Sequence, residues 1–257
     1  MNSEDVESIS VLKDASAAIY GARAANGVIL VTTKRGKEGK VKLNYSGNVS
    51  FSQPTRVPKM LNAYQYATYV NEFDAAQGNS LTYPETALTK IKDGSDPINY
   101  PDTNWWNAVA KDWATNTEHS LAISGGNEKI SFYSSAQYMY QDVIYKNSPQ
   151  NYNQYQFSTN LDAKITKAIK FGFDILGRQT VDNRGVRTTE DLFSYFLTTS
   201  PMSAPYYPNG LLRTGYDGIT NNAVLMVSDL PGTSKTTNNT LNLKPKIRID
   251  LDVITPG

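Results

Sequence analysis

The feature that most constrains the fold of this chain is an alternation of apolar and polar side chains at every second residue. Between residues 41 and 51 the odd positions are Val, Leu, Tyr, Gly, Val and Phe, with polar residues between them. Similar alternation recurs in residues 130–140, 153–165, 169–175 and 241–253. Because successive side chains of a strand point to opposite faces, this period predicts amphipathic β-strands. With the apolar pair Leu121 and Ile123, it predicts about six strands, several longer than usual in globular proteins.

The apolar faces of these segments carry no Asp, Glu, Lys or Arg, whereas the opposite face of the last segment is strongly charged. That face carries Lys244, Lys246, Arg248, Asp250 and Asp252. A one-residue slip in register would turn all five toward the apolar side. If lipid covers that side, the slip costs on the order of ten kcal/mol, at roughly 2–4 kcal/mol per Lys or Arg near the bilayer midplane. A soluble sandwich also keeps charges on its wet face, so a membrane barrel and a soluble β protein both remain open.

The connections between the expected strands alternate between tight turns and long links. The tight turns are residues 125–128 and 166–168, and the long links are residues 52–116 and 180–239, with helices expected after Asn62 and from Pro84. Short turns on one side and long loops on the other are typical of an outer-membrane barrel. Six strands cannot close a barrel wide enough for such loops, and open edges in hydrocarbon leave backbone groups unpaired. We therefore expect a fragment of a larger barrel.

The first forty residues differ from this pattern. Residues 6–12 and 28–33 predict two short strands, and residues 15–20 predict a helical turn that Asp14 caps and Gly21 ends. Asn26-Gly27 is a tight-turn signal before the second strand. A basic run follows, formed by Lys34, Arg35, Lys37, Lys40 and Lys42. This strand–helix–strand unit is too small to fold alone.

Composition excludes several classes of protein. The 257 residues include no Cys and one His, which excludes a disulfide framework, a thiolate metal site and a Cys nucleophile. A formal charge of +1 gives no global basic field for nucleic acid. No run approaches the roughly 18 apolar residues of a membrane helix, and the N-terminal residues lack the regions of a signal peptide. Any Ser-His-Asp triad would need His119, which we place at a strand start, so we expect no enzyme, metal or cofactor.

Four stretches resemble one known family. They are VLKDASAAIYGARAANGVILVTTKRGK at residues 11–37, YPDTNWWNAV at 100–109, ISGGNEKISFYSS at 123–135 and NLDAKITKAIKFGF at 160–173. Together they resemble SusC/RagA-type TonB-dependent outer-membrane transporters of Bacteroidetes. The first stretch is the most specific, because it is long and nearly gapless, and it is similar to the end of the plug domain. Its structural positions, expected to serve backbone geometry and packing, are Asp14, Tyr20, Gly21, Asn26 and Gly27.

The resemblance implies a β fold: a plugged transmembrane barrel of twenty-two strands. On this basis residues 1–38 are the end of an α+β plug, and residues 39–257 are the first barrel strands with their extracellular loops. The basic run would then lie at the periplasmic junction of plug and barrel. The resemblance further implies an outer-membrane location against lipid, a SusD-like lipoprotein cap, and TonB-driven import of glycans or peptides. We expect the chain to lack the signal sequence, the TonB-contacting segment, most of the plug and most of the strands.

Aromatic residues in the long links are the candidates for ligand contact. Flat indole rings stack on sugar faces and a carboxylate accepts hydrogen bonds from hydroxyl groups, so an outward loop with both would touch a glycan. The candidates are Asp102, Trp105, Trp106, Trp113, Tyr206 and Tyr207. The alternative for the paired Trp residues is that they anchor their loop to the barrel wall, and the resemblance favours it.

Other functions stay open at this stage. The first is a soluble or surface β-rich carbohydrate-binding module without transport activity. The second is a glycan hydrolase, which needs two facing carboxylates. Glu190 and Asp191 are adjacent acids in an expected loop and have no identifiable partner. A third is a receptor that signals, which needs a further N-terminal domain.

Overall fold

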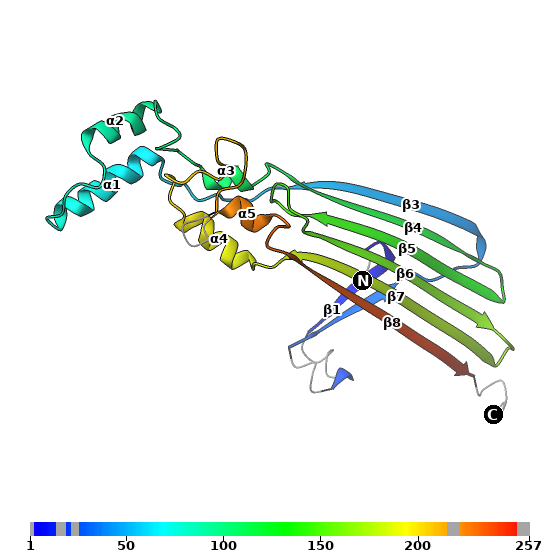
Figure 1. The fold of residues 1–257 in the computed structure, drawn as a ribbon. Coiled ribbons are helices and arrows are strands. Elements are labelled where there is room, and N and C mark those ends of the chain that lie inside the picture. The colour runs from blue at the N-terminus through cyan, green and yellow to red at the C-terminus, as the bar shows by residue number, and fades with distance from the viewer. Residues whose placement is uncertain (1–2, 14–18, 22–25, 215–221, 251–257) are drawn as a thin grey trace.

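The fold is a six-stranded antiparallel sheet with a small hairpin against it and a group of helices at one end (Figure 1). The computed structural model describes residues 3–13, 19–21, 26–214 and 222–250. The strands of the sheet, in spatial and chain order, are β3 (Gly39–Ser52), β4 (Ala114–Gly126), β5 (Ile130–Asp142), β6 (Asn151–Lys164), β7 (Ile169–Gly185) and β8 (Thr233–Ile249). The hairpin consists of β1 (Val6–Leu12) and β2 (Val28–Thr33), which follow the short 3₁₀ helix η1 (Ser3–Asp5). Consecutive strands pair throughout the sheet, as the alternating pattern predicts.

The register gathers the apolar residues on one face of the sheet. Leu43 lies opposite Ile123, Ile175 opposite Leu243, and Phe171 opposite Ile247. Leu43 is 67% exposed and Ile247 is 70% exposed, so no protein layer among the described residues covers this face. The residues between them, which point to the other face, are mostly polar. The sheet is therefore a single wall with one apolar and one polar surface.

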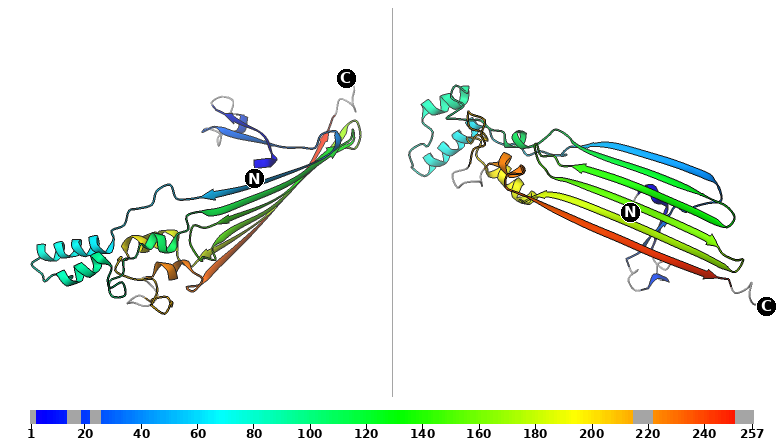
Figure 2. Two further views of the ribbon diagram at one scale, coloured as in Figure 1. Left: turned by 90° about the horizontal axis from the view of Figure 1, so that it is seen from above. Right: turned by 45° about the vertical axis from the view of Figure 1, so that its right-hand side comes forward.

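The two ends of the wall differ. Tight connections at residues 127–129 and 165–168 join strands at one end, whereas the helices gather at the other end (Figure 2). The expected helices are present: α1 (Ala63–Ala76) begins after Asn62, which forms a capping box with Gln65, and α2 (Glu85–Asp93) begins after Pro84. Three further helices lie in the long links: α3 (Trp105–Val109), α4 (Thr189–Thr198) and α5 (Ala223–Val227). In the part of the chain that the structure describes, no helix is long and apolar enough to cross a membrane.

The hydrophobic cores lie among these helices and not in the sheet. The larger cluster is formed by Trp105, Val109, Tyr145, Leu192, Phe196, Ala223, Met226 and Val227. A smaller cluster around Ala67 and Ile91 joins α1 to α2. Because the larger cluster combines α3, α4 and α5 with the link between β5 and β6, it fixes the loops relative to one another. The loops are thus a packed layer on the end of the wall.

Several sequence-based expectations need correction. β7 and β8 extend beyond the expected strands, to Gly185 and from Thr233, because their ends are polar on both faces and give no period-2 signal. Glu190 and Asp191 were expected in a loop, yet they form the first turn of α4, where Asp191 completes a capping box with Thr188. His119 was placed at a strand start but lies within β4.

The hairpin confirms the two short strands expected near the N-terminus. Gly27 lies between them with φ of +96°, a conformation that favours glycine, and a Cβ at this position would lie 3.1 Å from the carbonyl oxygen of Leu12. Gly21 also has positive φ, at +81°, and Tyr20 and Asn26 are exposed. Asp14 and most of the expected helical turn lie outside the described residues.

Gly36 brings the link after the hairpin into close contact with the wall. A Cβ at Gly36 would lie 2.3 Å from the backbone nitrogen of Phe132 in β5, closer than real Cβ contacts. Backbone cannot move aside as a flexible side chain can, so even the smallest side chain forces the link away from the sheet.

We expect Gly36→Ala to weaken the contact between hairpin and wall by about 1–3 kcal/mol, the usual cost of overpacking. Limited proteolysis of the segment 34–38 in the full-length protein measures this as faster cleavage. Gly177→Ala is the matched control, because a Cβ at Gly177 meets nothing within 4 Å. Equal cleavage of Gly36→Ala and the wild-type protein would show that the contact does not hold the hairpin.

Candidate functional site

The hairpin meets the polar face of the wall through a buried carboxylate. Asp5 is 5% exposed and lies just before β1. Its Oδ1 accepts a hydrogen bond from the Tyr133 hydroxyl at 2.9 Å, and its Oδ2 accepts one from the Ser158 hydroxyl at 3.1 Å. The Lys34 backbone N–H donates to the Asp5 carbonyl at 2.8 Å, which ties Asp5 to the end of β2. The carboxylate therefore joins the hairpin to β5 and β6.

A second contact is formed by Arg35, in the link between β2 and β3. One guanidinium nitrogen donates to both carboxylate oxygens of Asp162 at 3.1 and 2.9 Å, and the other donates to both oxygens of Asp174 at 3.1 Å. Lys246 of β8 also donates to Asp174. Burial lowers the pKa of Arg35, but its two carboxylate partners outweigh burial and raise the pKa above its ordinary value, so the guanidinium stays charged. One side chain thus bridges β6 and β7.

These contacts are polar, and the ion pairs of Arg35 are partly exposed. Asn160 adds a hydrogen bond from its amide to the Lys34 carbonyl at 3.0 Å. A cavity of 190 Å³ remains beside Asp5, Tyr133 and Asp174. Hydrogen bonds and partly exposed ion pairs exchange for water at small net cost, whereas separated apolar surfaces do not. The hairpin is therefore held to the wall by directional polar contacts and not by an apolar patch.

The sequence identified one half of this site. The basic run that includes Arg35 was expected at a junction between plug and barrel. Its partners Asp162 and Asp174, and the buried Asp5, were missed. The available signal was the position of both wall acids on the polar side of alternating segments, but sequence pattern does not say which cation reaches them.

The first group of ligand candidates lies in the loop layer. Asp102 accepts a hydrogen bond from the Ala63 backbone N–H at 2.7 Å, at the N-terminus of α1. Trp105 is 2% exposed, and its indole N–H donates to the Ser200 carbonyl at 3.0 Å. Trp106 packs against Phe193 and Phe196, and is half-buried. In this arrangement Asp102 and both Trp residues hold loop segments together.

The other candidates are exposed. Trp113 is 51% exposed immediately before β4. Tyr206 and Tyr207 are exposed in the second long link, where Tyr206 forms an isolated bridge with Leu212 and the Arg213 guanidinium lies over the Tyr207 ring at 5.2 Å. Their rings are available at the loop end of the wall. The structure does not gather them with Trp105 and Trp106 into one cleft.

Comparison with known proteins identifies the family. No protein-family model matches the chain. TonB-dependent receptor P26 of Formosa agariphila is 36% identical over 179 residues, which are 68% of this chain and 17% of that protein. TonB-dependent receptor SusC of Bacteroides thetaiotaomicron is 34% identical over 163 residues, 63% of this chain and 14% of that protein. A structure of the RagAB peptide importer in its 'open-open' state superposes with a TM-score of 0.70 at 23% identity, over 96% of this chain and 30% of that one.

This chain belongs to the SusC-type TonB-dependent receptors. It spans about a sixth of the length of the curated receptors that it matches. The solved structures share its fold, and the six-stranded wall corresponds to part of a TonB-dependent barrel. These relatives are receptors and not enzymes, as the sequence led us to expect. Receptors of this type lie in the outer membrane, where the exposed apolar face of the wall would meet lipid.

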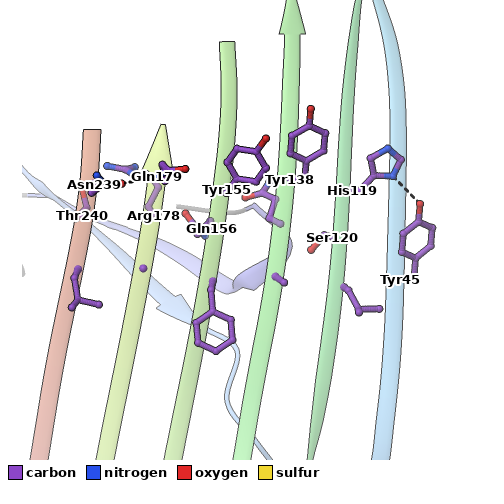
Figure 3. Close-up of a pocket in the computed structure, with 16 residues that line it drawn as sticks. Tyr45, His119, Ser120, Tyr138, Tyr155, Gln156, Arg178, Gln179, Asn239 and Thr240 are labelled. Atoms are coloured by element: carbon purple, nitrogen blue, oxygen red, sulfur yellow. Dashed lines mark hydrogen bonds between the residues drawn. The ribbon is translucent and has the colours of Figure 1, made fainter. Parts of the chain in front are cut away.

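The dimensions and side chains of the apolar face suit that environment. On β7 the positions of this face run from Ile169 to Gln179, eleven residues whose ten steps span about 25 Å at a rise of roughly 3.3 Å per residue and a tilt of roughly 40°. Near the loop end, the rings of Tyr138 and Tyr155 lie 5.1 Å apart, and Tyr45 shares a hydrogen bond of 2.8 Å with His119 (Figure 3). Aromatic rings at this depth form an interfacial girdle.

This SusC-type receptor should not tolerate charge on the apolar face. Leu243→Lys places an ammonium near the middle of that face and should cost about 2–4 kcal/mol in folding free energy. Asn242→Lys is the matched control, since residue 242 lies on the polar face of the same strand. Folding of the full-length receptor into lipid vesicles measures both variants. Equal losses in the two variants would contradict the assignment of the lipid face.

Loss of the contacts of Arg35 with Asp162 and Asp174 should weaken the attachment of the hairpin to the wall. Because the Arg35 and Asp162 side chains are 35% and 43% exposed, we expect Arg35→Gln to cost only about 1–2 kcal/mol. Arg35→Lys should recover only part of the loss, because an ammonium keeps the positive charge but cannot bind two carboxylates bidentately. Hydrogen exchange of the β1–β2 amides in the full-length receptor measures the change. Lys37→Gln removes only the exposed pair with Glu7 and should leave exchange unchanged, so equal effects of both substitutions would refute the role of Arg35.

Proposed function

We propose that this chain is part of an energy-coupled nutrient importer of the outer membrane. Residues 1–38 would be the end of its plug, and residues 39–257 would be the first barrel strands with their extracellular loops. The observation that carries the proposal is the polar junction of Asp5 and Arg35 with the face of the wall opposite the lipid. A domain on that side of a barrel wall lies in the lumen, where it blocks passage.

Import requires the plug to move away from the wall when energy is supplied. The polar contacts of Asp5 and Arg35 support a plug that detaches without exposing apolar surface on the wall. In the proposed mechanism, force applied through TonB from the periplasmic side pulls the plug from the wall and opens a path. The side chains of this chain bind and release, and none performs covalent chemistry.

Capture of the nutrient would occur at the loop end. Exposed Trp113, Tyr206 and Tyr207 supply flat rings that suit sugar faces or apolar peptide side chains. The family resemblance points to oligosaccharides, and the RagAB structures are of a peptide importer, so the cargo class is a glycan or a peptide. A SusD-like lipoprotein is the proposed partner at this outer end, and TonB is the proposed partner at the inner end.

Tethering the hairpin to the wall tests the proposal. Asp5 and Ser158 are in contact, and the 257 residues contain no native Cys. The double substitution Asp5→Cys and Ser158→Cys therefore permits a tether by oxidation or by a short bis-maleimide. We expect the tethered full-length receptor to bind cargo normally in cells but to import none. A reducing agent should restore import in the disulfide form.

The single substitutions Asp5→Cys and Ser158→Cys control for loss of the native hydrogen bond. If the tethered receptor imports cargo at the normal rate, the proposal is wrong, because import would then not require the hairpin to leave the wall. Cargo binding without any import by the untethered receptor, in cells that contain TonB, would point to a binding module instead.

A further inference from the structure

Three like charges lie side by side at the turn end of the polar face. Lys164 of β6 pairs directly with Lys170 of β7, and Lys170 pairs directly with Arg248 of β8. Neighbouring strands are about 4.8 Å apart, and like charges directly opposite one another are destabilising. All three side chains are exposed. The row is therefore an unfavourable arrangement unless an anion meets it.

The described carboxylates do not neutralise this row. Asp162 and Asp174, the nearest acids of the same face, bind Arg35, and Asp174 also binds Lys246. None of the ion pairs within the described ranges includes Lys164, Lys170 or Arg248. Three further acids lie around the row: Glu38 and Glu128 line the same cavity as the cation Lys129, and Asp250 follows Arg248 by two residues. Within the described ranges none of the three acids forms an ion pair with the row. A net positive charge remains at this end.

The row borders a cavity large enough for a ligand. Its volume is 400 Å³, and it lies between the row, the 127–129 turn and residue 38, just before β3. Lys129 and Lys246 line it together with the three cations of the row. An oxyanion held between two neighbouring strands accepts charge-assisted hydrogen bonds from two cations at once, and Arg248 adds a fork that suits such oxygens.

We propose that Lys164, Lys170 and Arg248 form a binding site for an oxyanion: a sulfate, phosphate or carboxylate group. The register places these residues on the polar face and not on the lipid face, so the anion belongs to a soluble molecule in the lumen and not to a lipid headgroup. If the chain acts in import, the site would favour anionic cargo near the periplasmic exit. That extension rests on the proposed function, whereas the binding itself does not.

Sulfate is the probe for the test, with the full-length receptor purified in detergent. Thermal unfolding is measured in millimolar sulfate and in chloride at equal ionic strength. We expect Lys170→Gln to raise the midpoint in chloride, because it removes the central repulsion, and to lose at least half of the upward shift that sulfate gives the wild-type receptor. Sulfate also stabilises proteins generally, because it is excluded from their surface. The evidence for binding is therefore the difference in sulfate shift between the wild-type receptor and the variants.

Lys167→Gln is the matched control, because it removes the same charge from the turn at the same end of the sheet, outside the row. It should keep the full sulfate shift. Arg248→Gln is the second variant of the row and should behave like Lys170→Gln, so the test survives if one variant folds poorly. An equal sulfate shift in all four proteins, or a lower midpoint of Lys170→Gln in chloride, would overturn the proposal.

The source of the anion is tested in nanodiscs with and without phosphatidylglycerol. A soluble source predicts the same sulfate shift in both. If phosphatidylglycerol removes the shift from the wild-type receptor alone, the occupant is a lipid headgroup and the proposed source is wrong. Because this measurement uses purified receptor without TonB or cargo, its result is independent of whether the receptor imports nutrients.

Discussion

The rest of the structure depends on the requirement that each strand presents two different faces to two different surroundings. Over the middle of β3 to β8 the apolar side chains share one exposed face, and the residues between them face water or the hairpin. A slip by one residue would bring Lys244, Lys246 and Arg248 to the lipid face together, so the register is fixed by the full set of strands and not by any single contact. The fixed register then places Tyr133, Ser158 and Asp162 on the polar face, where the hairpin binds them. The junction is thus a consequence of the same alternation that defines the wall.

The chemistry of the junction follows from that surface. A polar wall offers hydroxyls, amides and carboxylates, so a domain that binds it must supply complementary polar groups. Asp5 and Arg35 do so with opposite charges, one buried between hydroxyls and one shared between two carboxylates. Gly36 adds close backbone contact without apolar burial. Specific position and easy separation are therefore compatible here, which they would not be if the hairpin packed through a hydrophobic core.

The features that were predictable from the sequence are those with a local cause. Alternation is visible within ten residues, so β3, β5 and β6 were predictable. The capping residue Asn62 likewise predicted the start of α1. The ends of β7 and β8 were not, because beyond the lipid both faces are polar and alternation disappears. Helices α3 and α5 have five residues each and are held by packing over long sequence separations, which leaves no periodic signal. The pairing of Arg35 with Asp162 and Asp174 joins residues 127 and 139 positions apart, and local pattern cannot choose such partners.

The loop layer is stabilised in a different way from the wall. In the described part of the chain no protein layer covers the apolar face of the wall, so loops that depended on the wall alone would have little to pack against. Instead they form their own core, in which the buried Trp105 donates to the Ser200 carbonyl across 95 positions and joins the first long link to the second. Such a core lets the loops keep one arrangement at the end of the wall, while exposed rings such as Trp113 and Tyr207 lie outside that core. The two Trp residues of the same short helix, Trp105 and Trp106, hold the layer together, and the exposed rings take no part in that core.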